Sequence, residues 1–328
     1  MSRTADPERP NWVELPRDVT AAIFSKLGAI EVLTSVQYVC SSWLKMCKDP
    51  SMWRTIDMHN LGDSFDMNFD LEKICRVAID RSNGNLSCIN LEYFGNDELL
   101  HYIADRYFIS FIFLFLFVGN LSSNLKNLRL VFCYSISDRG LIDCIGKFPL
   151  LEELDLSYCS LSIESLEAVG HCCPLLKSLK LNIQGSRYPV IECDEEALVI
   201  GKYMHELRHL QLFGNRLTNS GLEAILNGCP HLESLDLRQC FNVNLEGNLE
   251  KRCFGQIKDL RRPNDSTSDY EFDAELPSSD AGCESFDDYD DPYGVSDIEL
   301  LTDEDNYDDS YYEFSDYNNF DYVDLFFD

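Results

Sequence analysis

Apolar positions near the N-terminus recur with a helical period. Between residues 17 and 27 they share one helical face: Val19, Ile23, Phe24 and Leu27. Pro16 can begin this helix because its first turn requires no backbone donor, and Gly28 can end it. A second stripe comprises Leu33, Val36, Val39 and Cys40, and Ser41 and Ser42 can cap a third helix that carries Trp43. Three short helices bury too little to be stable alone, so we expect this apolar surface to pack against a partner.

Further along the chain the pattern changes to Leu-x-x-Leu-x-Leu, with one Ile substitution, and repeats. The six units begin at Leu86, Leu125, Leu151, Leu176, Leu207 and Leu232, with spacings of 39, 26, 25, 31 and 25 residues. The last two apolar positions of each unit alternate as in a strand, and the segments 137–145 and 218–225 favour helices. A single strand and helix cannot bury their apolar face, so we expect the units to stack into a curved parallel sheet with outer helices.

Residues between the inward leucines should face solvent on the concave side of such a stack. We predict seven of them as candidates for binding a target protein: Arg129, Asp155, Lys180, Gln211, Phe213, Asp236 and Arg238. Few residues of an interface carry most of its binding energy, so we expect only some of these to contribute. The alternative is that most of them are simply solvated.

The N-terminal pattern resembles the F-box. Leu15-Pro16, Ile23-Phe24-x-x-Leu27, Val39-Cys40-x-x-Trp43 and Trp53 follow one another in the order and at the spacing of that motif. The resemblance implies docking onto the Skp-type linker of SCF ubiquitin ligases, which joins a cullin and a RING subunit. The contacts that it implies are Leu15, Pro16, Ile23, Leu27, Leu33, Val39, Cys40, Trp43 and Trp53. Some of these must also form the motif's own core, and the sequence does not separate the two roles.

The repeats resemble the cysteine-containing leucine-rich repeats that often follow an F-box. Cys133, Cys159 and Cys240 lie three residues after the final Leu of their units, where this repeat has a small buried residue. Together the two resemblances identify the chain as a member of the plant F-box/LRR family. They imply an α/β fold with a flexible N-terminus (1–10), a helical F-box (11–58), a linker (59–84), a repeat solenoid (85–260) and a disordered tail (261–328). A different kind of solenoid is the alternative.

Composition changes abruptly after Arg262. Residues 263–328 contain 23 Asp or Glu and no Lys or Arg, so of the net charge of −30 the tail carries −23 and residues 1–262 carry −7. Such a block of like charge should be disordered, and it argues against binding nucleic acid, whose phosphates require Lys and Arg. The tail also holds 14 Phe and Tyr, a pattern that suits short contacts with a basic partner. A tail that merely improves solubility is the alternative.

Chemistry-bearing motifs are few. The 14 cysteines include no Cys-x-x-Cys pair, and the N-terminus lacks a secretory signal, so we expect reduced thiols, no zinc and a nuclear or cytoplasmic location. No phosphate loop, dinucleotide fingerprint or nucleophile–base signature is present, so we expect neither cofactor nor catalysis. We therefore predict a substrate receptor of a ubiquitin ligase. The alternative is an interaction scaffold that acts outside such ligases.

The segment from Tyr107 to Val118 is almost entirely apolar and does not fit the repeats. It has 12 residues, fewer than the roughly 20 of a membrane helix, so we do not expect it to span a membrane. Removing residues 107–121 would change the first repeat spacing from 39 to 24, close to its neighbours. Our hypothesis is that residues 107–121 are an insertion foreign to the repeat frame. A buried helix or strand is the alternative.

Deleting Tyr107–Leu121 should raise both the soluble yield and the melting temperature. An apolar segment that finds no burial promotes aggregation, and its removal restores the repeat spacing. Expression of both forms with a thermal melting curve for each provides the measurement. A deletion form that is less soluble and melts lower would show that the segment belongs to the core.

Overall fold

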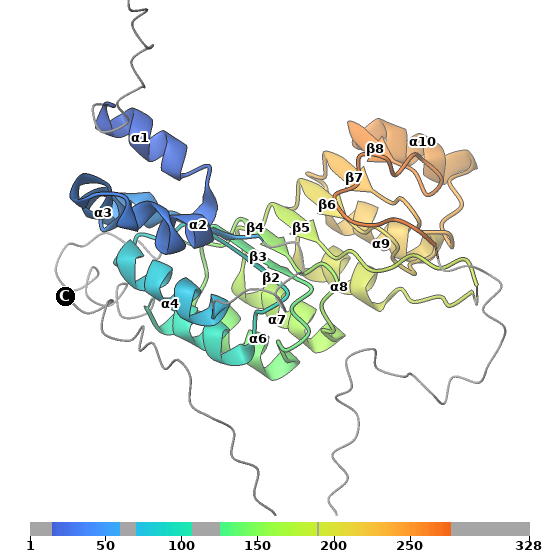
Figure 1. The fold of residues 1–328 in the computed structure, drawn as a ribbon. Helices are drawn as coiled ribbons and strands as arrows, with labels where there is room; N and C mark the ends of the chain where they lie inside the picture. The colour runs from blue at the N-terminus through green and yellow to red at the C-terminus, as the bar shows by residue number, and fades with distance from the viewer. Residues whose placement is uncertain (1–14, 60–69, 107–124, 189, 277–328) are drawn as a thin grey trace, which may run out of the picture. The chain divides into compact units, whose positions relative to one another are not determined.

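A helical N-terminal part leads into one parallel sheet in the computed structural model, which describes residues 15–59, 70–106, 125–188 and 190–276 (Figure 1). The sheet has eight strands in the order β1 to β8. Their bounds are β1 Thr55–Met58, β2 Cys88–Glu92, β3 Asn127–Val131, β4 Glu153–Asp155, β5 Ser178–Lys180, β6 His209–Gln211, β7 Ser234–Asp236 and β8 Asp259–Arg261. The predicted fold class, a helical F-box followed by stacked strand-and-helix repeats, is confirmed.

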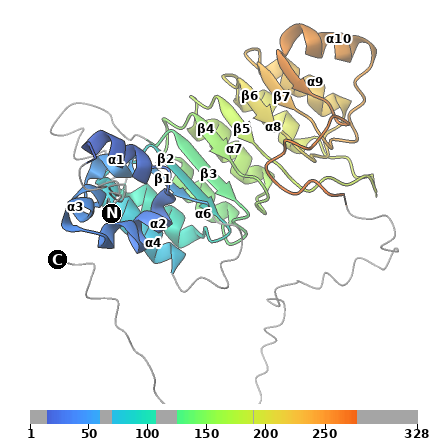
Figure 2. The same ribbon diagram turned by 45° about the horizontal axis from the view of Figure 1, so that its top comes forward.

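Helices fall into two groups. The first group precedes the sheet: α1 Arg17–Phe24, α2 Gly28–Thr34, the 3₁₀ turn η2 Val36–Tyr38, α3 Ser41–Cys47 and the 3₁₀ turn η3 Pro50–Trp53. The second group alternates with the strands: α4 Leu71–Ser82, α6 Asp138–Ile145, α7 Ile163–Cys172, α8 Glu195–Tyr203, α9 Asn219–Gly228 and α10 Gly247–Gln256. Residues 97–106 are also helical. Helices α4 and α6 to α9 lie along the same face of the sheet (Figure 2).

Register between the strands follows the repeated leucines. Leu128 is paired with Leu154, and the same line continues through Leu179, Leu210 and Leu235. Each of these side chains is buried between the sheet and the helices. A shift of one residue would turn the whole line to solvent, so the leucine spacing fixes the register of every strand.

Repeat cysteines join neighbouring units. The thiol of Cys133 lies 3.5 Å from the carbonyl oxygen of Leu91, and that of Cys240 lies 2.9 Å from the carbonyl oxygen of Leu212. Burial raises the pKa of Cys133 to about 12, so this thiol stays protonated and can donate its hydrogen. All the cysteines in the described part of the chain are free thiols.

Helix starts also bridge consecutive repeats. The carboxylate of Asp97 accepts hydrogen bonds from the backbone N–H and the hydroxyl of Ser137, at 2.8 and 2.6 Å. Asp194 accepts the same pair from Thr218, both at 2.7 Å. Because Ser137 and Thr218 are the N-caps of α6 and α9, each carboxylate fixes the start of the next helix.

Two strands lie beyond the six repeat units that the leucine pattern revealed. Strand β1 belongs to Trp53-x-x-Ile56-x-Met58, which has the repeat spacing but overlaps the end of the F-box motif. Strand β8 belongs to Ile257-x-x-Leu260-x-Arg262, where a charged residue replaces the final Leu. The stack therefore starts inside the F-box motif and ends at the border of the predicted tail.

The F-box helices and the repeats share one core. Trp53 is buried, and its indole N–H donates to the carbonyl oxygen of Cys47 at 2.7 Å. Arg81 of α4 donates to the side chain of Gln37 at 2.8 Å and lies 5.6 Å from the Trp53 ring. Helix α4 occupies part of the predicted linker 59–84, so the described residues of that stretch are packed structure rather than a spacer.

Local details of the helical part differ from the sequence prediction. Gly28, with φ of +79°, begins α2 rather than ending α1, whose last residue is Phe24. The N-cap of α3 is Cys40, and no side chain caps that helix. In both places an aperiodic turn shifts the helix boundary by a few residues, which a spacing pattern does not register.

The predicted insertion 107–121 lies outside the described residues. On either side of it, β2 and β3 pair in the same parallel register as the other strands, with Cys88 opposite Asn127. Among the described helices, none has both the length and the apolar character needed to cross a membrane by itself.

Truncating Leu179 should destabilise the fold far more than truncating its neighbour Lys180. Leu179 is fully buried, whereas Lys180 lies on the opposite face of the same strand. Leu179→Ala should lower the free energy of unfolding by about 2–5 kcal/mol. Lys180→Ala should lower it by less than about 1 kcal/mol. Urea titration of both variants measures the difference, and equal losses would contradict the alternation of the strand.

Candidate functional site

The predicted linker-binding residues divide into a buried and a surface group. Leu33 and Trp53 are each 3% exposed and belong to the core. The other seven are partly or fully exposed: Leu15, Pro16, Ile23, Leu27, Val39, Cys40 and Trp43. Of the surface group, Ile23 and Trp43 also pack against the core, so the two roles overlap at these positions. Contact with the linker stays a prediction for the surface group.

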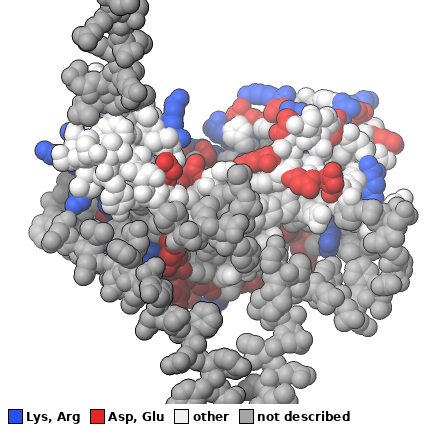
Figure 3. Space-filling model, in the orientation of Figure 1, with Lys and Arg blue, Asp and Glu red and all other residues white. Residues whose placement is uncertain are grey.

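Helices α1 to α3 expose an unusual amount of apolar surface. Leu27 is 45% exposed and Val39 is 59% exposed, with Val19 and Tyr38 similarly open. The visible side of these helices carries few charged side chains (Figure 3). A hollow of about 360 Å³ lies beside α1, lined by Phe24, Ala29 and other residues of α1, α2 and η3. Apolar surface of this kind on a folded domain indicates a protein-binding face.

A polar row crosses the opposite surface of the sheet, between the buried leucines. In strand order it consists of Asp57, Asn90, Arg129, Asp155, Lys180, Gln211, Asp236 and Arg261, each opposite the next. Arg129 is bonded to Asp155 at 3.2 Å and also to Asn90 and Glu92, and Lys180 lies 3.6 Å from Asp155. The row brings together five of the seven predicted target-binding residues.

An aromatic residue follows each of the strands β2, β3 and β4, two positions after the last inward-facing leucine of its repeat unit. The rings of Tyr93 and Phe132 stack at 4.8 Å, and those of Phe132 and Tyr158 stack at 4.6 Å. All three residues have positive φ, which turns the chain out of the strand and points successive rings the same way. Together with Phe213, which follows β6, we call Tyr93, Phe132 and Tyr158 the strand-end surface.

The chain after β8 covers this surface. It turns back from Pro263, and the segment 266–274, which we call the strap, runs past the strand ends (Figure 2). The ring of Tyr270 stacks on Phe213 with 3.7 Å between centroids, and its hydroxyl lies 3.0 Å from that of Tyr158. Phe272 meets the rings of Phe132 and Tyr158 edge-on, both at 5.4 Å.

Ion pairs hold the strap before and between these rings. Glu271 contacts Arg129 at 2.5 Å, and Asp269 contacts Arg238 at 2.5 Å and Arg261 at 3.1 Å. Desolvation of Asp269 acts to raise its pKa, but a backbone hydrogen bond and the positive charge of Arg238 prevail and lower it. Asp269 and Glu271 therefore meet arginines of the repeat surface, as opposite charges in a complementary interface do.

The predicted exposure is wrong for three target-binding residues, two of which, Phe213 and Arg238, contact the strap. Phe213 is buried beneath Tyr270, Arg238 is enclosed by Asp236 and Asp269, and Asp155 is buried beside Arg129 and Ser157. Arg129, Lys180, Gln211 and Asp236 are partly exposed. The composition of residues 261–328 predicts disorder throughout, yet Arg261 belongs to β8 and residues 266–274 contact the strand ends. Residues 277–328 lie outside the described part of the chain.

Three of the four aromatic residues of the strand-end surface were not predicted from the sequence, which indicated only Phe213. Tyr93, Phe132 and Tyr158 lie outside the alternating strand positions, so the leucine pattern gave them no role. Their common place, two residues after the final inward residue in the first three units, is the signal that could have revealed them.

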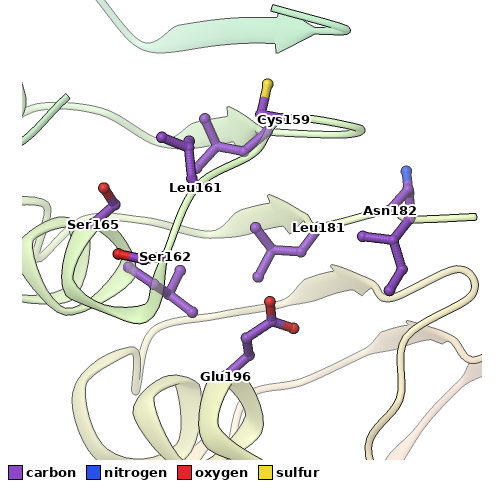
Figure 4. Close-up of a pocket in the computed structure, with 10 residues that line it drawn as sticks. Cys159, Leu161, Ser162, Ser165, Leu181, Asn182 and Glu196 are labelled. Carbon is purple, nitrogen blue, oxygen red and sulfur yellow. The ribbon is translucent and has the colours of Figure 1, made fainter. Parts of the chain in front are cut away.

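A small cavity lies between the repeats, near Cys159, Leu161, Leu181 and Glu196 (Figure 4). Its volume of about 40 Å³ suits water rather than an organic ligand, because ligand pockets measure roughly 300–1,000 Å³. Burial raises the pKa of Glu196, against the hydrogen bond that its carboxylate accepts from Asn215. No cluster of three or more metal-binding side chains occurs among the residues that the structure describes.

Two family models match the chain, an F-box-like model over residues 12–59 and a leucine-rich repeat model over residues 203–226. One similar solved structure, a complex of Rad7 and Elc1 in yeast, covers 75% of this chain and 82% of its own, with 13% identity and a TM-score of 0.33. A likeness this weak carries no argument about function.

Similar proteins of known sequence are informative. The Arabidopsis thaliana "F-box protein SKIP19" is 49% identical over 321 residues, which cover 96% of this chain and 95% of that protein. "Putative F-box/LRR-repeat protein 23" of Arabidopsis thaliana is 52% identical over 266 residues, covering 80% of this chain and 55% of that protein. With the matched F-box model, the eight stacked strands and these relatives, the chain belongs to the plant F-box/LRR-repeat family.

Proposed function

We propose that this protein is the substrate-recognition subunit of an SCF-type ubiquitin ligase. In this role the F-box helices dock onto a Skp-type linker, which connects the protein to a cullin and a RING subunit. The strand-end surface and the neighbouring polar row hold a target protein. We further propose that it acts in the nucleus or the cytoplasm, without binding a membrane or nucleic acid.

The observation that carries this proposal is the exposed apolar face of α1 to α3. Leu27 and Val39 face solvent here, whereas the inward-facing leucines of the repeat strands are buried. Burying a Leu or Val side chain contributes about 1.5–3 kcal/mol, so a partner that covers this face gains substantial binding free energy. The opposite side of the same motif packs against the repeats through Trp53, so this face remains for an external partner.

The proposed mechanism is proximity rather than chemistry on this chain. A receptor that holds a target beside a charged ubiquitin-conjugating enzyme raises the effective concentration of the target's lysines at the thioester. The shared core of F-box and repeats supports this role, because it limits independent movement of the two binding parts. An adaptor of this kind needs no nucleophile, metal or cofactor of its own.

An interaction scaffold outside ubiquitin ligases remains the second hypothesis. It shares the target surface but requires no linker, cullin or RING subunit. Co-purification of a cullin with the full-length chain from plant tissue supports the ligase role, and its reproducible absence while other partners are retained supports the scaffold.

Two charged substitutions on the F-box face should abolish linker binding. Leu27→Asp with Val39→Asp replaces exposed apolar contacts by carboxylates that the interface would have to desolvate. We expect the linker retained in a pull-down to fall at least tenfold, which corresponds to about 1.4 kcal/mol. Unchanged retention by a variant whose melting curve matches that of the wild type would refute the proposed docking face.

A matched control is available on the repeats. Ile142 of α6 and Leu198 of α8 are 39% and 55% exposed, close to the values for the F-box pair. Ile142→Asp with Leu198→Asp makes the same change in charge and hydrophobicity at a comparable exposure. This control variant should retain the linker fully.

A further inference from the structure

We propose that the strand-end surface is a receptor for acidic–aromatic peptides with the pattern Asp-Tyr-Glu-Phe, and that Asp269–Phe272 of the strap is its intramolecular occupant. The partner is a protein segment that carries two aromatic residues two positions apart, with one carboxylate before the first ring and a second carboxylate between the two rings. This inference rests on the proposed function and specifies the chemistry of the target segment.

The two rings of the strap occupy different sites on the surface. Tyr270 lies flat on Phe213, at an interplanar angle of 4°, and its hydroxyl meets that of Tyr158. Phe272 stands edge-on to Phe132 and Tyr158, at angles of 86° and 83°. The charge distribution of aromatic rings favours edge-on pairs such as those of Phe272, and the flat contact of Tyr270 with Phe213 covers one face of each ring. The surface therefore selects an aromatic residue at both positions.

The two carboxylates are recognised as specifically as the rings. Arg129 reaches Glu271 while it holds Glu92 and Asp155, and Arg238 reaches Asp269 while it holds Asp236. Each arginine is therefore fixed by acidic residues of the repeats before it meets the strap. Such pre-positioned guanidinium groups favour a carboxylate in the strap over a neutral or basic residue.

Few contacts of the strap depend on its attachment to β8. The side chain of Gln239 donates to the carbonyl oxygen of Ala274 at 2.7 Å, and Arg238 donates to that of Ser266 at 3.0 Å. Any peptide backbone offers the same carbonyl groups, so a separate chain can make these bonds. Covalent attachment adds an effective concentration in the millimolar range, which a target must overcome to displace the strap.

The sequence contains a partial second copy of the pattern. Tyr312-Glu313-Phe314 repeats Tyr270-Glu271-Phe272 within the acidic tail, but Tyr311 stands where the strap has Asp269. Residues 311–314 lie outside the described part of the chain. Because they share both rings and the carboxylate between them, they are the second internal segment that could compete for the surface.

Fluorescence anisotropy with a labelled peptide of residues Ser266–Glu275 tests the proposal. The receptor is the full chain with Tyr270→Ala, Phe272→Ala, Tyr312→Ala and Phe314→Ala, so that neither internal copy competes. We expect saturable binding by this variant, at least tenfold tighter than by the wild-type chain. A peptide with both aromatic residues replaced by alanine should bind at least tenfold more weakly than the native peptide.

Charge variants in the same background locate the binding surface. Arg261→Glu removes a contact with Asp269 and should weaken peptide binding, most clearly at low salt. Lys258→Glu makes the same change in charge at a residue that pairs with Glu233 instead, and it should leave binding unchanged. Equal effects of the two variants would overturn the assignment, because binding would then depend on the overall positive charge of the region and not on the contact between Arg261 and Asp269.

Two further outcomes would overturn the proposal. One is absence of saturable binding by the variant with four alanine substitutions although it melts cooperatively, and the other is equal binding of the native and alanine peptides. Should the fourfold variant not fold, Glu271→Lys with Glu313→Lys replaces it, because a lysine at 271 is repelled by Arg129 while every ring remains. Neither outcome affects the linker pull-down, so failure here is distinguishable from failure of the proposed function.

Discussion

The register of the parallel strands is the constraint on which the rest of this structure depends. Leu154, Leu179 and Leu210 lie opposite one another because any other register would turn them to solvent. The same register places Arg129 opposite Asp155, and it stacks Phe132 on Tyr158 just beyond the strands. Core, polar row and strand-end surface are thus three consequences of one alignment, since each occupies a fixed position within every repeat.

A stack of repeats needs an element that covers its first strand and a segment that covers its apolar strand ends. The F-box motif provides β1 at one end, where Ile56 and Met58 continue the inward line and Trp53 joins the two parts. The strap covers the aromatic strand ends through Tyr270 and Phe272. The F-box thus ends the stack and exposes the apolar face for which we propose a linker, and the strap covers the surface that we propose receives the target.

Leucine spacing predicted the repeats, because the core of a repeat protein is periodic, and the resemblance of the N-terminal motif to the F-box predicted the helical part. Features that break the period were missed. The unit of β8 has Arg262 where the other units have an apolar residue, and Trp53 belongs to the F-box motif although it also begins a repeat. Burial of Phe213 depends on Tyr270, far along a segment whose charge predicted disorder. Composition describes such a segment on average, whereas specific contacts with three arginines and three aromatic residues of the repeats hold these few residues in place.

Hydrogen exchange of the full-length protein, followed by mass spectrometry, tests the central claim most directly. The claim is that Ser266–Ala274 lie on the strand ends, with Tyr270 between Phe213 and Tyr158. Amides of this segment should exchange more slowly than those of a free peptide of the same sequence, and Tyr270→Ala with Phe272→Ala should remove the protection. Exchange of the strap at the rate of the free peptide in the wild-type chain would contradict the account.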